Sequence, residues 1–163
     1  MSNIAARAAI CLTLPSSKGL VAKVAQWLTD LCELTLADEE VASRLHMAAY
    51  ELIENVLKYG DRPEIDLELE LQRAGDTATL RLTAHNTTTP ERLAEVVQRL
   101  EELRAAKDPV AYYDQLVRDT APLAGRSGLG LARIRAEGYL GVDFKVDGQR
   151  LSIEVETSVK ENG

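Results

Sequence analysis

The sequence contains few aromatic residues, only two cysteines and no long apolar run. Aromatic side chains make up 4% of the 163 residues, so the core must be built from Leu, Val, Ile and Ala. No run approaches the roughly 18 apolar residues of a membrane-spanning helix, and we expect no membrane association. The apolar stretch at residues 4–14 is interrupted by Arg7, and no convincing cleavage site follows it. We therefore interpret this stretch as a strand and expect a cytoplasmic protein.

Basic residues are outnumbered by acidic ones. The chain has 19 Lys and Arg residues against 26 Asp and Glu, which gives a formal net charge of −7. Nucleic acids and anionic membranes both bind basic surfaces, so neither is an expected partner. Cys11 and Cys32 match no metal-binding or redox spacing and lie in apolar stretches, which predicts buried free thiols.

The apolar and charged fractions, 45% and 28%, are those of a globular protein, and the length fits one domain over residues 1–163. The pattern predicts a strand, helices at 16–34 and 38–59, a hairpin, two further helices, a glycine-rich helix start and a final hairpin. This order predicts an α+β fold, a two-layer sandwich of a mixed, mostly antiparallel sheet with the helices on one face. The predicted core residues come from several of these elements: Trp27, Leu45, Leu52, Ile53, Leu80, Leu131 and Ile134.

Three polar side chains share one stripe of the helix predicted at 38–59. At about 100° per residue, Glu51, Asn55 and Lys58 fall within roughly 60° of one another, beside the apolar stripe. An Asn oxygen is a suitable Mg²⁺ ligand, a carboxylate one turn away can accept a proton, and a Lys can neutralise phosphate. The alternative is an ordinary solvated stripe that includes a helix pair between Glu54 and Lys58.

A glycine-rich segment, Gly-Arg-Ser-Gly-Leu-Gly at residues 125–130, precedes another predicted helix. Glycines before a helix let the backbone approach an anion, and the free N–H groups of the helix start point toward it. Arg126 and Ser127 would add hydrogen-bond donors to Gly128 and Gly130. A flexible connection would have the same composition, so this segment alone does not establish an anion site.

Together, and in this order, the two motifs resemble those of the histidine-kinase-like ATPase superfamily. Glu51-x-x-x-Asn55-x-x-Lys58-Tyr-Gly is similar to the Asn-box helix in the form of the anti-sigma-factor serine kinases. Ser-Gly-Leu-Gly-Leu at 127–131 is similar to the second glycine box. The resemblance implies ATP held with Mg²⁺, with Asn55 as the metal ligand and Glu51 as the general base. It also implies nucleotide contacts from Lys58 and from the glycine box, which comprises Arg126, Ser127, Gly128, Leu129 and Gly130.

The first glycine box of the superfamily, Asp-x-Gly-x-Gly, is absent. The sequence has His-Asn-Thr-Thr-Thr-Pro at 85–90, where the family Asp would bind the adenine amino group. Asn86 is the residue that we expect to take this role, because a carboxamide can donate to and accept from an adenine edge. The lost glycines imply a different loop shape.

The strand that ends in an Asn, the helices that follow and the late glycine box resemble the SiaB-type branch, small bacterial regulatory kinases that act on STAS-domain partners. The resemblance implies a partner-switching serine/threonine kinase with a helical, lid-type insertion at about 87–127, and a homodimer is a further expectation. A second hypothesis remains open: a degenerate module that binds no nucleotide and regulates by sequestering its partner. The retained Glu51 and Asn55 favour the kinase, and the altered adenine box favours the module.

Overall fold

The structure is a computed structural model that describes residues 6–36, 38–120 and 129–160. It contains strands and helices in the order expected from the sequence. Their bounds are β1 (Ala6–Pro15), α1 (Lys18–Leu36), α2 (Glu39–Tyr59), β2 (Glu64–Ala74), β3 (Thr77–Thr87), α3 (Pro90–Ala105), α4 (Pro109–Thr120), α5 (Leu129–Ala136), β4 (Gly141–Asp147) and β5 (Arg150–Lys160).

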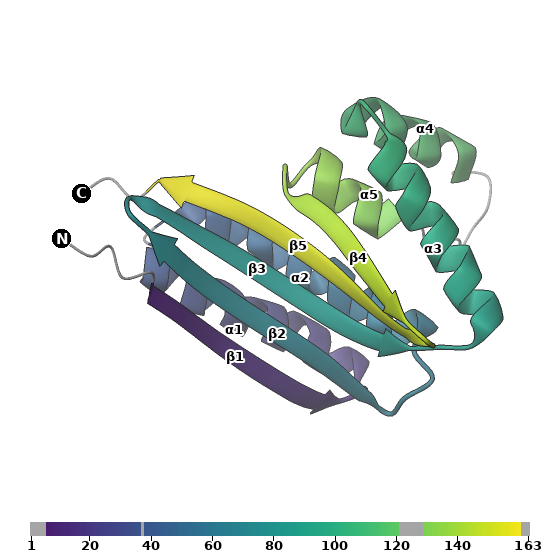
Figure 1. Ribbon diagram of the computed structural model, residues 1–163, viewed down its shortest axis with the longest axis horizontal. Helices are drawn as coiled ribbons and strands as arrows, with labels where there is room; N and C mark the ends of the chain where they lie inside the picture. Colours follow the sequence, from purple (N-terminus) through teal and green to yellow (C-terminus); the bar gives the residue numbers. More distant parts are fainter. Residues whose placement is uncertain (1–5, 37, 121–128, 161–163) are drawn as a thin grey trace.

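The five strands form one sheet in the order β1-β2-β3-β5-β4. Every neighbouring pair in it is antiparallel. Helices α1 and α2 run along one face of this sheet, and α5 continues the layer toward β4, where α3 and α4 pack (Figure 1). The predicted α+β two-layer sandwich is therefore confirmed. None of the helices in the described part of the chain combines the length and the apolar character needed to cross a bilayer.

Helix α2 carries the predicted polar stripe, and both of its ends are fixed by local contacts. Asp38 caps the start, because its carboxylate accepts a hydrogen bond from the Val41 backbone N–H at 3.0 Å. Gly60 follows the last turn, and its N–H donates to the Val56 carbonyl at 2.8 Å. The φ angle of Gly60, −76°, is one that any residue can adopt. Glycine is needed here because a Cβ would lie only 2.5 Å from the Val56 carbonyl oxygen.

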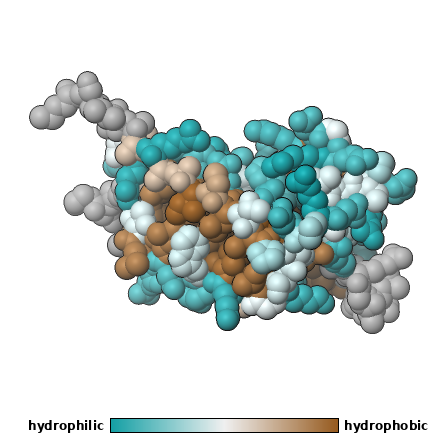
Figure 2. All heavy atoms as spheres, turned by 90° about the horizontal axis from the view of Figure 1, so that it is seen from below, coloured by the Kyte–Doolittle hydropathy of each residue, from teal (hydrophilic) through white to brown (hydrophobic). Residues whose placement is uncertain are grey.

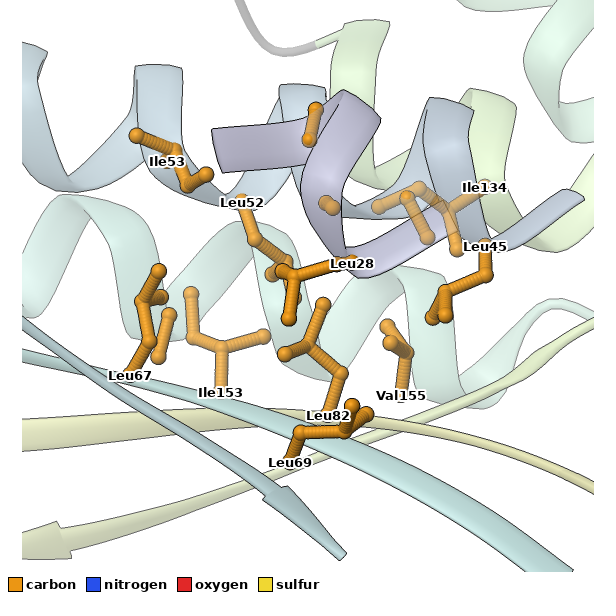
Figure 3. Close-up of a cluster of buried hydrophobic side chains, with 14 of the residues drawn as sticks. Leu28, Leu45, Leu52, Ile53, Leu67, Leu69, Leu82, Ile134, Ile153 and Val155 are labelled. Atoms are coloured by element: carbon orange, nitrogen blue, oxygen red, sulfur yellow. The ribbon is translucent and has the colours of Figure 1, made fainter. Parts of the chain in front are cut away.

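Buried aliphatic side chains fill the space between the helices and the sheet (Figure 3). They come from α1, α2 and α5 on one side and from β2, β3 and β5 on the other. The labelled members of this core are Leu28, Leu45, Leu52, Ile53, Leu67, Leu69, Leu82, Ile134, Ile153 and Val155. Of the seven predicted core residues, Leu45, Leu52, Ile53, Leu80 and Ile134 are buried, and Leu131 is half-buried against the core.

Two side chains predicted to be buried are exposed. Trp27 is 44% exposed, because α1 buries the neighbouring stripe that contains Val21 and Leu28. Cys11 is exposed on β1, since strand alternation turns it away from the helices, whereas its neighbours Ile10 and Leu12 face them. The prediction of a buried free thiol is therefore correct for Cys32 and wrong for Cys11.

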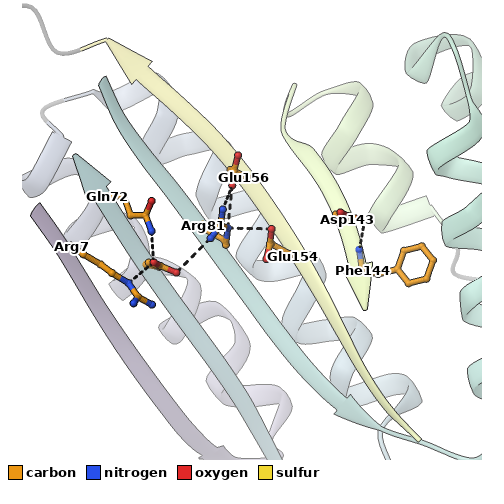
Figure 4. Close-up of polar contacts among 8 residues, drawn as sticks. Arg7, Gln72, Arg81, Asp143, Phe144, Glu154 and Glu156 are labelled. Carbon is orange, nitrogen blue, oxygen red and sulfur yellow. Dashed lines mark hydrogen bonds and ion pairs between the residues drawn. The ribbon is translucent and has the colours of Figure 1, made fainter. Parts of the chain in front are cut away.

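The face of the sheet that the helices do not cover is polar. The candidate site lies on the other side of the sheet, in the helical layer. Arg81 on β3 lies at its centre, 2.5 Å from Glu156, 3.1 Å from Glu154 and 3.6 Å from Glu70 (Figure 4). Arg7 on β1 contacts the same Glu70 at 2.5 Å. These cross-strand ion pairs satisfy the side chains of an uncovered sheet face.

Candidate active site

The two sequence motifs meet in three dimensions. Glu51, Asn55 and Lys58 on α2 line an open hollow of about 510 Å³ together with Gly130 from the start of α5. The spacing on α2 predicted the grouping of the first three, and the packing of α2 against α5 adds the glycine. Leu129, the first residue of α5, is half-buried beside them. Arg126, Ser127 and Gly128 lie outside the described residues.

Glu51 packs directly onto Gly130. A Cβ on that glycine would overlap the Oε2 atom of Glu51, so only glycine permits this approach. The Glu51 side chain is 18% exposed, and its Oε1 lies 3.5 Å from Nη1 of Arg133, whose Nε also contacts Glu137 at 2.6 Å. Burial raises the pKa of Glu51, and the Arg133 guanidinium partly opposes this rise. A carboxylate with a raised pKa is better suited to accept a proton near neutral pH.

The amide nitrogen of Asn55 is already engaged in a hydrogen bond within α2. Its Nδ2 donates to the Glu51 backbone carbonyl at 2.8 Å, one turn earlier on α2. The carbonyl oxygen Oδ1 is the atom of this side chain that can coordinate a hard cation. The described residues contain no cluster of three or more His, Cys, Asp or Glu side chains able to hold a metal. A metal at this place would therefore need Asn55 together with oxygens of a ligand and water.

A second cavity, of about 300 Å³, lies on the other side of Asn55. Its walls come from α2, α3, α4 and α5, and its volume is at the lower end of the range for small-molecule sites. Tyr59 from α2, Glu102 from α3 and Tyr112 from α4 are among its polar and aromatic members. The sequence analysis did not identify the residues from α3 and α4, because each helix shows only an ordinary amphipathic pattern.

Lys58 is exposed and lies over the ring of Tyr59, with Nζ 5.4 Å from the ring centroid. This contact joins the rims of the two cavities, because Lys58 lines the larger hollow and Tyr59 lines the smaller cavity. A lysine at the mouth of such a hollow can neutralise an anionic ligand without being buried.

Asn86 does not line either cavity. Strand β3 continues to Thr87, paired with Arg150 of β5, where the sequence suggested a polar connecting segment. Asn86 thus faces the helical layer at 9% exposure, and its Oδ1 has no hydrogen-bond partner among the described residues. A Cβ on Gly60 would lie 2.9 Å from this oxygen. The atom is therefore buried beside the end of α2.

The residues present fit Mg·ATP best at the phosphate end. The glycine cradle at Gly130, the carboxamide of Asn55 and the ammonium group of Lys58 have the chemistry that a metal and phosphate oxygens require. At the adenine end, no Asp follows β3, and the expected Asn86 is enclosed.

Comparisons with known proteins support the resemblance. A family model described as the histidine kinase-like ATPase domain matches residues 14–137, from the end of β1 through α5. Among solved structures, a chain of the SiaB–SiaC complex from Pseudomonas aeruginosa has the same fold, with a TM-score of 0.64 and 14% sequence identity. That match covers 92% of this chain and 89% of the other. No curated protein sequence matches the chain. The chain belongs to the histidine kinase-like ATPase family.

Proposed function

We propose that the protein is a cytoplasmic, ATP-dependent serine/threonine kinase of the anti-sigma-factor type, similar to the SiaB-type regulators. It binds and phosphorylates a small STAS-domain partner in a bacterial partner-switching pathway. The observation that carries this proposal is the packing of Glu51 onto Gly130 beside Asn55, within a chain of the histidine kinase-like ATPase family. The likeness of this fold to that of a chain in the SiaB–SiaC complex supports a role for this protein in binding a partner protein.

Each residue of the site has a chemical task in this proposal. ATP supplies the phosphoryl group, and Mg²⁺ neutralises part of its charge. Asn55 binds the metal through Oδ1, Lys58 neutralises phosphate oxygens, and the backbone at Gly130 approaches the phosphates. Glu51 accepts the proton that the partner's hydroxyl group loses on phosphorylation. Its contact with Arg133 must loosen for this step, because a carboxylate held by a guanidinium is a weaker base.

The test compares two variants of α2 with a matched control. Asn55→Ala should abolish Mg·ATP binding, whereas Glu51→Gln should leave binding largely intact and lower phosphoryl transfer by about 10²–10⁴-fold. Glu68→Gln removes the same charge from the opposite face of the sheet and should change neither. The measurements are calorimetric titration with Mg·ATP and transfer of labelled phosphate to a STAS-domain partner.

The second candidate is a module that binds no nucleotide and sequesters its partner. The enclosed Asn86 and the lack of the Asp-x-Gly-x-Gly box favour it. The same titration separates the two candidates: if the wild-type protein does not bind Mg·ATP at millimolar concentration, the kinase proposal fails and sequestration explains partner binding.

We also propose a homodimer that joins two copies through β1 and α1. Strand β1 is ten residues long and has only one charged side chain, Arg7, whereas the other edge strand, β4, carries three charges and contacts α3. An uncovered edge strand with few charges readily pairs with another strand. Figure 2 shows apolar side chains gathered on this side of the molecule. The larger exposed and half-buried apolar side chains of the two elements are Ile10, Leu12 and Leu14 of β1 and Leu20, Val24, Trp27, Leu31 and Leu34 of α1.

The charges of α1 favour a second copy as the occupant. Lys18 and Lys23 lie in the first half of the helix, and Asp30 and Glu33 lie in the second half. Two copies related by a two-fold axis perpendicular to α1 would place their α1 helices antiparallel, so that each basic half meets an acidic half. Leu34→Lys, at a side chain 87% exposed, should convert a dimer to a monomer in sedimentation experiments, and Val110→Lys on α4 should not. A monomeric wild-type protein at micromolar concentration would contradict this proposal.

A further inference from the structure

The family's adenine-binding carboxylate has no counterpart at the end of β3. Asn86 stands there instead, with its carbonyl oxygen enclosed against the end of α2. A base that enters the cavity beside Asn55 would meet other side chains. Recognition of the base must then come from the walls of that cavity, which are built largely by α3 and α4.

One carboxylate on these walls is held in place by a neighbouring side chain. Glu102 on α3 accepts a hydrogen bond at Oε1 from Nε2 of Gln98, at 3.0 Å. Tyr112 on α4 lines the same cavity, and burial, followed by the negative charge of Glu102, raises the pKa of its phenol. Two carboxylate oxygens offer about four acceptor positions, so the bond from Gln98 leaves capacity for a ligand.

The surroundings of Glu102 suit a flat aromatic ligand. Tyr59 and Tyr112 both line the cavity, and the remaining wall includes the apolar side chains Val96, Leu103 and Leu116. Aromatic and aliphatic walls with a few fixed polar groups are typical of sites that hold a nucleobase. Glu102 and Asp119, the two carboxylates on the wall, are both exposed, and Glu102 is the one that a neighbouring side chain, Gln98, holds by a hydrogen bond.

We propose that Glu102, held by Gln98 and lining the same cavity as Tyr112, accepts a hydrogen bond from the exocyclic amino group of adenine, so that α3 and α4 recognise the base. This inference rests on the proposed nucleotide-binding function. Adenine presents an amino donor at its C6 position, whereas guanine presents a carbonyl acceptor there. A carboxylate therefore attracts adenine and repels guanine at this position, which makes Glu102 a specificity determinant.

The experiment measures the affinities of the full-length protein for Mg·ATP and Mg·GTP by calorimetry. Wild type should prefer ATP. Glu102→Gln should weaken ATP binding about tenfold and narrow the preference over GTP, since the carboxamide can also donate to the guanine carbonyl. Tyr112→Phe should cause a smaller loss of ATP affinity, because Glu102 keeps its contact with Gln98.

Glu101→Gln is the matched control. It removes the same charge from the adjacent position of α3, where the side chain pairs with Arg104 at 3.5 Å and does not line the cavity. The inference is overturned if the affinities of Glu102→Gln for the two nucleotides equal those of Glu101→Gln. It is also overturned if Asn86→Ala, and not Glu102→Gln, loses the preference for ATP over GTP. If the wild-type protein binds neither nucleotide, the proposed kinase function fails first and this inference fails with it.

Discussion

At the residue scale, Glu51 and Gly130 lie so close together that a change at one moves the other. Gly130→Ala would push the Glu51 carboxylate away from its place. The side chain has flexible torsions, so we expect the free energy of unfolding to change by less than about 1 kcal/mol, the size of a Gly-to-Ala effect in a helix. Phosphoryl transfer should nevertheless fall at least about tenfold, because a displaced base loses its alignment.

Gly19→Ala in α1 is the control for this prediction. A Cβ there would come no closer than 3.8 Å to another side chain, so both stability and transfer should remain near wild type. Thermal unfolding and labelled-phosphate transfer, measured on both variants, separate a misplaced Glu51 from a damaged fold. Full transfer activity in Gly130→Ala would show that the close approach has no role in the reaction.

Glu51 also makes stability depend on pH. Because burial raises its pKa in the folded state above the ordinary value, ionisation of Glu51 costs folding free energy as the pH rises through that pKa. Glu51→Gln should therefore have a higher melting temperature than wild type at pH 7. The difference should shrink as the pH falls toward 4, where the wild-type carboxyl group becomes protonated. A constant difference across this range would mean that the charge of Glu51 is not the cause.

The sequence identified the α2 half of the site better than the rest. Glu51, Asn55 and Lys58 share a stripe through helical geometry alone, so their grouping follows from spacing. The position of Asn86 depends on how far β3 stays paired with β5, and that is a tertiary property. Glu102 and Tyr112 line one cavity only because α3 and α4 both border it in the folded chain, and no local pattern in either helix reports this.

At the scale of the elements, the start of α2 depends on one capping side chain. Asp38→Ala removes the acceptor for the Val41 N–H, and we expect a loss of about 0.5–2 kcal/mol in the free energy of unfolding. Asp38→Asn keeps an acceptor and should lose much less. Urea unfolding of both variants tests the cap, and equal losses would indicate that the charge near the helix dipole matters more than the hydrogen bond.

Helix α1 shows why the element boundaries were easier to predict than the burial of each face. Its apolar residues form two adjacent stripes, one that contains Val21 and Leu28 and one that contains Val24 and Trp27. Either stripe is enough to predict a helix from its periodicity. Which stripe is buried depends on how α1 packs against the rest of the fold, and the buried one contains Val21 and Leu28. Alternation of apolar and polar residues identified the strands in a similar way, and β3 runs to Thr87, into the segment 85–90 that replaces the first glycine box.

At the scale of the whole molecule, stability should be distributed unevenly. Residues of α2 such as Ala48, Ala49 and Leu52 are fully buried, whereas α4 has no buried residue and packs mainly on α5. Native-state hydrogen exchange should be slowest in α2 and β3 and fastest, among the described helices, in α4. Mg·ATP should slow exchange in α3 and α4 and leave α1 unchanged. Equal protection of α4 and α2 without ligand would contradict this picture.

The direct passage from β3 into α3 has a mechanical consequence. Thr89 caps α3, and Pro90 begins it only three residues after the last residue of β3, so the helix is attached to the sheet by a short joint. Glu102 lies 12 residues beyond Pro90, about 18 Å along the helix axis at 1.5 Å per residue. A tilt of about 10° at the joint would therefore sweep Glu102 through about 3 Å, much more than the tolerance of a hydrogen bond. The angle between β3 and α3, which the short connection sets, therefore determines the position of the Glu102 carboxylate near the far end of α3.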